Sequence, residues 1–151
     1  VGQEFLAILE QRDFPFDSFK ALASSRSAGK KIAFKGKEYI VEELTKDSFE
    51  GIDITLFSAG GERSRQFGPA AAKAGAVVVD NSSAFRMDAE VPLVIPEINP
   101  EKIKDNKGII ANPNCSTIIA IVPVWPLHKA NAVKRMVVST YQAASGAGQP
   151  L

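Results

Sequence analysis

The sequence contains a single cysteine, and this scarcity argues against one class of protein. One thiol cannot form a disulfide within the chain, which disfavours a secreted, disulfide-stapled domain and favours a reducing compartment. Charge of one sign is also lacking: a net charge of +1 gives no electrostatic basis for binding nucleic acid or an anionic membrane. The longest apolar run, 118–126, is too short to span a bilayer, and no signal or transit peptide is visible.

The sequence is rich in apolar residues. Hydrophobic residues make up 45% and charged residues 23%, a composition typical of an ordered globular domain. Its 151 residues suffice for one domain, or for one domain and part of another. The sequence starts with Val1 rather than Met and ends at Gln149-Pro150-Leu151 without an evident terminus, so we expect it to be a fragment of a longer protein. The missing targeting sequence then says little about the compartment.

Short apolar segments alternate with helical ones along the chain. The predicted helices cover 1–11, 66–75 and 116–129, and two prolines, Pro123 and Pro126, should distort or shorten the last one. The predicted strands are 19–23, 53–57, 76–79, 108–111 and 135–141, with a hairpin formed by 31–34 and 38–41. Strands that are apolar on both sides, alternating with helices, predict an α/β fold with a Rossmann-like, doubly wound, mostly parallel sheet.

Four loops that follow predicted strands are rich in Ser, Asn and Gly. They are residues 24–30, 58–61, 80–83 and 112–117. In a parallel sheet such loops gather at the carboxyl edge, where ligands bind, so together they indicate a nucleotide site. Any one of them alone could equally be an ordinary turn.

The loop after the second expected Rossmann strand discriminates between cofactors. NAD-binding domains usually place an acidic residue there, but this chain has Ser24-Ser25-Arg26-Ser27. A carboxylate would repel a 2′-phosphate, whereas an arginine flanked by hydroxyls can bind it. A dinucleotide at this site is therefore predicted to be NADP(H), and the alternative is a solvated turn that happens to contain Arg26.

The cysteine stands at the predicted start of a helix, in the segment "NPNCSTI". Asn114 suits the N-cap position, and the unpaired N–H groups that follow it can stabilise a thiolate at Cys115. A thiolate beside a nicotinamide site suggests thioester formation followed by hydride transfer. The alternative is that Cys115 is a small buried hydrophobe. No metal site is predicted.

Six segments, in this order and spacing, resemble the aspartate-β-semialdehyde dehydrogenase family: "SSRSAGK", "LFSAGG", "DNSSAFRM", "VPLVIPEIN", "NPNCSTI" and "STYQAASGAG". The resemblance spans essentially the whole chain. It implies an NADP-binding Rossmann-type domain over 1–114, lacking its first strand and most of its Gly-rich turn. It also implies that 115–151 begin an α+β catalytic and dimerisation domain.

The resemblance further implies a reaction. Cys115 would attack the acyl phosphate of L-aspartyl 4-phosphate, and NADPH would reduce the thioacyl enzyme to L-aspartate 4-semialdehyde. Gln142 would contact the substrate and orient the intermediate, Arg86 would hold the phosphate, and Asn114 would border the pocket. Taken singly, Arg86 could be a surface ion-pair residue and Gln142 a polar strand edge. The cofactor-binding residues implied are Val1, Ser24, Arg26, Ser27, Ser58, Ala59, Gly60, Ser145 and Gly146.

One departure from the family concerns the general acid/base, a histidine well downstream of the glutamine. The one histidine here, His128, falls near the end of the helix after Cys115, where it should interact with the last carbonyls. We do not assign it the acid/base role, and we expect the fragment to be inactive alone. The whole enzyme should be a homodimer or homotetramer acting in lysine, threonine, methionine, isoleucine and diaminopimelate biosynthesis.

Three alternatives remain. N-acetyl-γ-glutamyl-phosphate reductase shares the acyl-phosphate chemistry, but its "NPGCYPT" segment differs at Asn114 and after the cysteine. Glyceraldehyde-3-phosphate dehydrogenase carries "SCTTN", which is absent here. A non-catalytic nucleotide-binding module is the alternative from another class. Bacterial cytoplasm and plastid stroma both fit the sequence as compartments.

Overall fold

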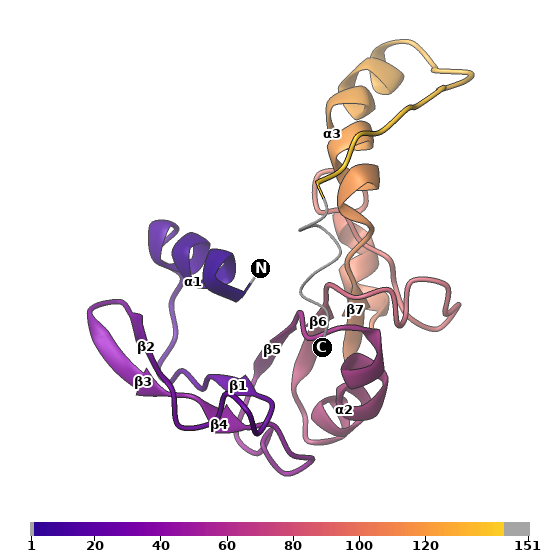
Figure 1. The fold of residues 1–151 in the computed structure, drawn as a ribbon. Coiled ribbons are helices and arrows are strands. Elements are labelled where there is room, and N and C mark those ends of the chain that lie inside the picture. The colour runs from indigo at the N-terminus through magenta and orange to yellow at the C-terminus, as the bar shows by residue number, and fades with distance from the viewer. Residues whose placement is uncertain (1, 144–151) are drawn as a thin grey trace.

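The computed structural model describes residues 2–143 (Figure 1). Its elements, in chain order, are α1 (Gly2–Gln11), β1 (Leu22–Ala23), β2 (Lys31–Phe34), β3 (Lys37–Ile40), β4 (Glu42–Glu43), β5 (Ile54–Phe57), α2 (Gly61–Lys73), β6 (Val77–Asp80), the 3₁₀ helix η1 (Pro100–Asp105), β7 (Ile109–Ala111) and α3 (Cys115–Ala130).

The largest sheet among the described residues joins β5, β6 and β7, all parallel. Its strands are short, apolar and rich in β-branched residues, as expected of a sheet covered by helices. Helix α2 provides the crossover from β5 to β6, which a parallel pair requires. The predicted α/β fold with a mostly parallel sheet is confirmed.

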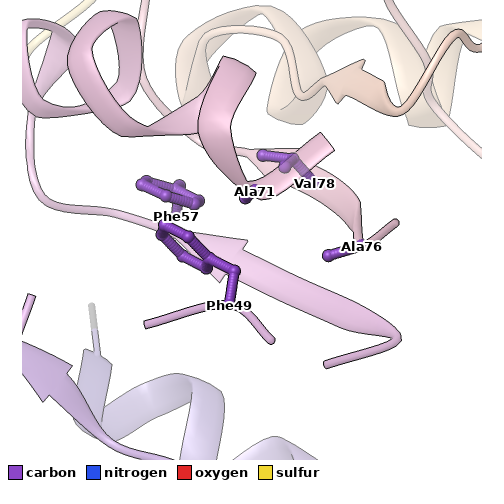
Figure 2. Packing of buried hydrophobic residues seen from close by; sticks show 5 residues of the cluster. All are labelled: Phe49, Phe57, Ala71, Ala76 and Val78. Atoms are coloured by element: carbon purple, nitrogen blue, oxygen red, sulfur yellow. The ribbon is translucent and has the colours of Figure 1, made fainter. Parts of the chain in front are cut away.

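The core lies between this sheet and α2. Phe49, Phe57, Ala71, Ala76 and Val78 form the buried cluster drawn in Figure 2, and the two phenylalanine rings lie 6.0 Å apart between centroids. The buried residues of α2, Ser64, Gly68 and Ala71, are all small, and small side chains allow the helix to approach the strands closely.

Two smaller sheets complete the described part of the fold. Strands β1 and β4 form a parallel pair, and β2 and β3 form the predicted hairpin. The turn of the hairpin is Lys35-Gly36, both with positive φ (45° and 71°), the backbone that a two-residue hairpin turn of type I′ requires. Strand β4 and the 3₁₀ helix η1 were not predicted from the sequence.

One sequence prediction about the C-terminal part is wrong, and one alternative of another is also wrong. Residues 131–143 contain no regular secondary structure, so the strand predicted over 135–141 does not form. A strand needs a neighbour for its backbone N–H and C=O groups, and this segment is exposed rather than paired. Of the two effects predicted for Pro123 and Pro126, distortion or shortening of the last helix, the shortening does not occur, because α3 runs for 16 residues.

Helix α3 extends away from the three-stranded sheet (Figure 1). It is apolar on every side, yet none of its residues is buried, and Ile119 is 74% exposed. Within residues 2–143, no helix combines the length and the apolar character needed to cross a bilayer.

Gly108 shows how closely α2 and β7 approach each other. A Cβ added at Gly108 would lie 2.8 Å from the Cβ of Ala72, whereas one added at Gly75 would meet no atom of the described residues within 4 Å. Both glycines have a φ of +99°, so the two positions differ in available space and not in φ.

We therefore predict that Gly75→Ala lowers the free energy of unfolding by about 1–2 kcal/mol through backbone strain. Gly108→Ala should lower it by about 1–3 kcal/mol more, because the added methyl group overpacks the α2–β7 contact. Urea titration of the two variants measures the difference. Equal losses would show that α2 and β7 do not pack as closely as described.

Candidate active site

The register of the three-stranded sheet aligns the ends of its strands. Phe57 pairs with Asp80, and Asp80 pairs with Ala111, so all three strands end at the same level. The loops that follow them, 58–60, 81–85 and 112–114, therefore leave one carboxyl edge, as the sequence predicted for three of its four loops. The fourth loop, 24–30, follows β1, which belongs to a separate two-stranded sheet, and its predicted place on the same sheet edge is wrong.

Asp80 ends β6 and is completely buried. Its Oδ1 accepts hydrogen bonds from Ser64 Oγ (2.6 Å) and from the Ser82 backbone N–H (3.2 Å), and its Oδ2 accepts one from Ser82 Oγ (2.7 Å). Three donors compensate for the loss of water around a buried carboxylate. The carboxylate thus connects α2, which carries Ser64, to the loop after β6.

Arg86 connects the ends of β6 and β7. Its Nε donates to the backbone carbonyl of Asn112 (2.9 Å) and its Nη2 donates to that of Asn81 (3.1 Å). The Asn112 side-chain amide also donates to Asn81 Oδ1 (2.7 Å). Among the described residues, Arg86 forms no ion pair and its Nη1 makes no hydrogen bond. The half-buried guanidinium is therefore held by neutral acceptors and keeps its positive charge available to an anion.

Cys115 is the first residue of α3, and its side chain is exposed. Asn114 is the N-cap, and its side-chain oxygen accepts a hydrogen bond from the Ser116 N–H (2.9 Å). The position predicted for Cys115 and the cap predicted at Asn114 are both confirmed. The alternative of a buried, inert cysteine is contradicted by the exposure of the thiol.

Gln142 approaches Cys115 although 27 positions separate them in the chain. Its amide Nε2 donates to the Cys115 Sγ at 3.8 Å, a distance suited to a weak hydrogen bond to sulfur. The residues from 131 onward carry Gln142 back along α3 to the N-terminal end of the helix. The structure thus brings together the two residues for which the family resemblance implied catalytic roles.

The candidate cofactor residues fall into three groups. Ser58, Ala59 and Gly60 form the exposed loop between β5 and α2, and Gly60 has a φ of +89° at the N-cap of that helix. Ser24, Arg26 and Ser27 lie in the turn after β1, where Arg26 is exposed and has no ion-pair partner among the described residues. Val1, Ser145 and Gly146 lie outside the described residues.

His128 lies far from the candidate site. It is thirteen positions after Cys115 in α3, which corresponds to about 20 Å along the helix axis. Its Nδ1 accepts a hydrogen bond from the Val133 N–H (3.1 Å), and its ring stacks on Trp125. His128 was expected to interact with the last carbonyls of the helix, but among the described residues its ring accepts a hydrogen bond from the Val133 N–H instead. Its distance from Cys115 makes it unsuited to proton transfer there.

Sequence reasoning missed the hydrogen-bonded network that joins Asp80 to Ser82 and Ser64. The sequence did contain a signal for Asp80. This aspartate directly follows the apolar run "AVVV", and the alternation of the strand places its side chain on the same buried side as that of Val78. For Ser64 no signal was available, because a serine on a polar helix turn is ordinary until the packing of α2 is known.

Comparison with known proteins gives consistent results. The family model described as "Semialdehyde dehydrogenase, NAD binding domain" matches residues 1–106. Aspartate-semialdehyde dehydrogenase of Aquifex aeolicus is 60% identical over 151 residues, covering 98% of this chain and 44% of the relative. The chain thus spans less than half the length of that curated relative.

Comparison with solved structures agrees with these sequence matches. Aspartate semialdehyde dehydrogenase II of Vibrio cholerae superimposes with a TM-score of 0.92 at 48% identity, covering 97% of this chain and 44% of that one. The Candida albicans aspartate semialdehyde dehydrogenase, solved with NADP, gives a TM-score of 0.72 at 28% identity, covering 87% and 44%. The resemblance indicated by the sequence motifs is confirmed.

The contact between Gln142 and Cys115 can be tested through thiol reactivity. Gln142→Glu would place a carboxylate about 4 Å from the sulfur, where repulsion between unit charges in water amounts to about 1 kcal/mol. We predict that alkylation of Cys115 by iodoacetamide, followed by mass spectrometry, slows about fivefold. Gln66→Glu, the same change at an exposed site on α2, is the control and should leave the rate unchanged. Equal rates for both variants would place Gln142 away from the thiol.

Proposed function

Because the chain belongs to the semialdehyde dehydrogenase family, we propose that the complete gene product is an NADP-dependent aspartate-semialdehyde dehydrogenase. It would convert L-aspartyl 4-phosphate to L-aspartate 4-semialdehyde and inorganic phosphate. The observation that carries this proposal is the exposed Cys115 at the start of α3, with the Gln142 amide 3.8 Å from its sulfur.

Cys115 is proposed as the nucleophile. Its sulfur attacks the acyl carbon, the carbon–oxygen bond to the phosphoryl group breaks, and the electron pair of that bond leaves with inorganic phosphate. NADPH, when bound, supplies the hydride that reduces the resulting thioester. The carbon–sulfur bond of the thiohemiacetal then breaks, releasing the aldehyde and restoring Cys115. The free N–H groups of the first turn of α3 support a developing negative charge on sulfur.

Gln142 and Arg86 are proposed to bind the reacting groups. The Gln142 amide already donates to the sulfur, so it can donate to the carbonyl oxygen of an acyl group bound to that sulfur. Arg86 has an unbonded Nη1 among the described residues and no neutralising carboxylate, which suits the dianionic phosphoryl group. Asn114, which directly precedes the nucleophile in the chain, is proposed to border the substrate site.

The turn after β1 fits the 2′-phosphate of NADP. Arg26 is exposed and free of ion pairs within the described residues, and Ser24 and Ser27 flank it. No carboxylate stands within this turn to repel a phosphate. Together with Ser58, Ala59 and Gly60, these residues are proposed to hold the cofactor, and the Candida albicans relative solved with NADP supports the choice. Val1, Ser145 and Gly146 stay predictions from the sequence.

We further propose that residues 1–114 form the cofactor-binding domain and that Cys115 opens the catalytic domain. The general acid/base is proposed to be a histidine outside this sequence, since His128 is remote from the thiol. The 151-residue chain alone is then inactive. The complete protein would act in the biosynthesis of lysine, threonine, methionine and isoleucine, as a homodimer or homotetramer.

The nucleophile is tested by Cys115→Ser in the complete gene product. We expect NADPH-dependent reduction of L-aspartyl 4-phosphate to fall below detection, because a serine hydroxyl has no nearby base in the described residues to ionise it. The dissociation constant of NADPH, measured by fluorescence titration, should stay within about twofold, since the cofactor residues are unchanged. Near-normal turnover of the serine variant would contradict the proposed chemistry.

The cofactor preference is tested by Arg26→Ala. Loss of charge-assisted hydrogen bonds to the 2′-phosphate should weaken NADPH binding about 10- to 100-fold. NADH lacks that phosphate, so its affinity should change by no more than about twofold. Arg12→Ala is a matched control, because Arg12 is an exposed arginine directly after α1 and is not among the proposed cofactor residues. An equal loss for NADPH and NADH would refute the assignment of Arg26.

A further inference from the structure

The buried carboxylate of Asp80 stands at the end of β6, directly before the loop that carries Arg86, but forms no ion pair with Arg86. Its three hydrogen-bond donors are the hydroxyls of Ser64 and Ser82 and the backbone N–H of Ser82. All three are neutral groups. A direct ion pair would have neutralised the guanidinium, whereas this arrangement leaves its charge free.

Ser82 transmits the position of Asp80 to the following turn. Its hydroxyl donates to Asp80 Oδ2 at 2.7 Å and accepts from the Ala84 N–H at 3.0 Å. This one buried side chain therefore fixes the backbone on both sides of residue 83. Arg86 lies two residues after Ala84, and its guanidinium returns to the Asn81 carbonyl at the start of the same loop.

Ser64 holds the other side of the carboxylate. Its hydroxyl donates to Asp80 Oδ1 at 2.6 Å, but it lies within α2 and has no bond to the loop that carries Arg86. The two serines thus contribute bonds of similar length to the same buried carboxylate. They differ in what they connect: Ser64 connects it to a helix, and Ser82 connects it to the turn before Arg86.

We propose that Asp80 and Ser82 are positioning residues that hold the 81–86 loop so that Arg86 presents Nη1 to the phosphoryl group of the substrate. This inference rests on the proposed function for the identity of the anion. Asp80 and Ser82 do not touch the substrate. They act by fixing the loop, and the two backbone carbonyls of Asn81 and Asn112 then fix the guanidinium.

The two serines provide a matched test in the complete gene product. The reaction is run in reverse, as NADP⁺ reduction by L-aspartate 4-semialdehyde, with inorganic phosphate varied. Ser82→Ala should raise the KM for phosphate about tenfold, the scale of one charge-assisted hydrogen bond. Its KM for NADP⁺ should stay within about twofold. Ser64→Ala should leave both constants within about twofold, although it also removes a buried hydrogen bond and lowers the melting temperature.

Ser82→Thr keeps the hydroxyl and should restore the KM for phosphate to within about threefold of the unmodified protein. If Ser64→Ala and Ser82→Ala raise this constant equally, the effect is general loosening and the positioning role is refuted. No change in either variant refutes it as well. Should Ser82→Ala not fold, Asp80→Asn replaces it, since the amide keeps the shape of the carboxylate but weakens its hydrogen bonds to Ser82 and Ser64, and Ser64→Ala then shows the effect of losing the Ser64 bond alone.

Crystal structures of the variants test the inference apart from activity. Ser64→Ala should retain both bonds from Arg86 to the carbonyls of Asn81 and Asn112, and Ser82→Ala should lose at least one. Retention of both bonds in Ser82→Ala overturns the positioning role even if the enzyme is active. Absence of phosphate-dependent NADP⁺ reduction in the unmodified protein refutes the proposed function instead, and the crystal structures still decide the positioning role.

Discussion

The parallel pairing of β6 with β5 on one side and β7 on the other determines the rest of the structure. Its register places Phe57, Asp80 and Ala111 at one level, so three loops that are far apart in sequence leave the sheet together. A shift of one residue would turn Asp80 out of the core and separate it from Ser64. The candidate site therefore depends on strand register before it depends on any reactive side chain.

The same register links Arg86 to the segment that leads to Cys115. Arg86 spans the ends of β6 and β7 through two main-chain carbonyls, and β7 leads within four residues to Cys115. Asn114 begins α3 at that point by capping it. The chain thus changes from strand to helix next to a guanidinium whose charge is not neutralised by any described residue.

Much of this arrangement could be predicted from local sequence. Buried strands such as "ITLF" and "VVVD" are recognisable because they are short, apolar and bounded by polar turns, and Asn114 is recognisable as a cap by residue type. The strand predicted over 135–141 failed because alternation of residue types cannot supply a neighbouring strand. The loop after β1 was assigned to the wrong sheet for a similar reason, since no single segment of the sequence determines the order of the strands in a sheet.

The Arg86 anchorage uses only main-chain acceptors, and this has an evolutionary consequence. Carbonyl oxygens are present at every position, so exchanging the side chain at 81 or 112 leaves both acceptors in place. These acceptors are inherited with the topology of the sheet, whereas the loop that brings Arg86 to them depends on the side chains of Asp80 and Ser82. Homologues that have diverged at these two positions can therefore orient an arginine in the same way, and sequence comparison at those positions alone would underestimate how widely the arrangement is shared.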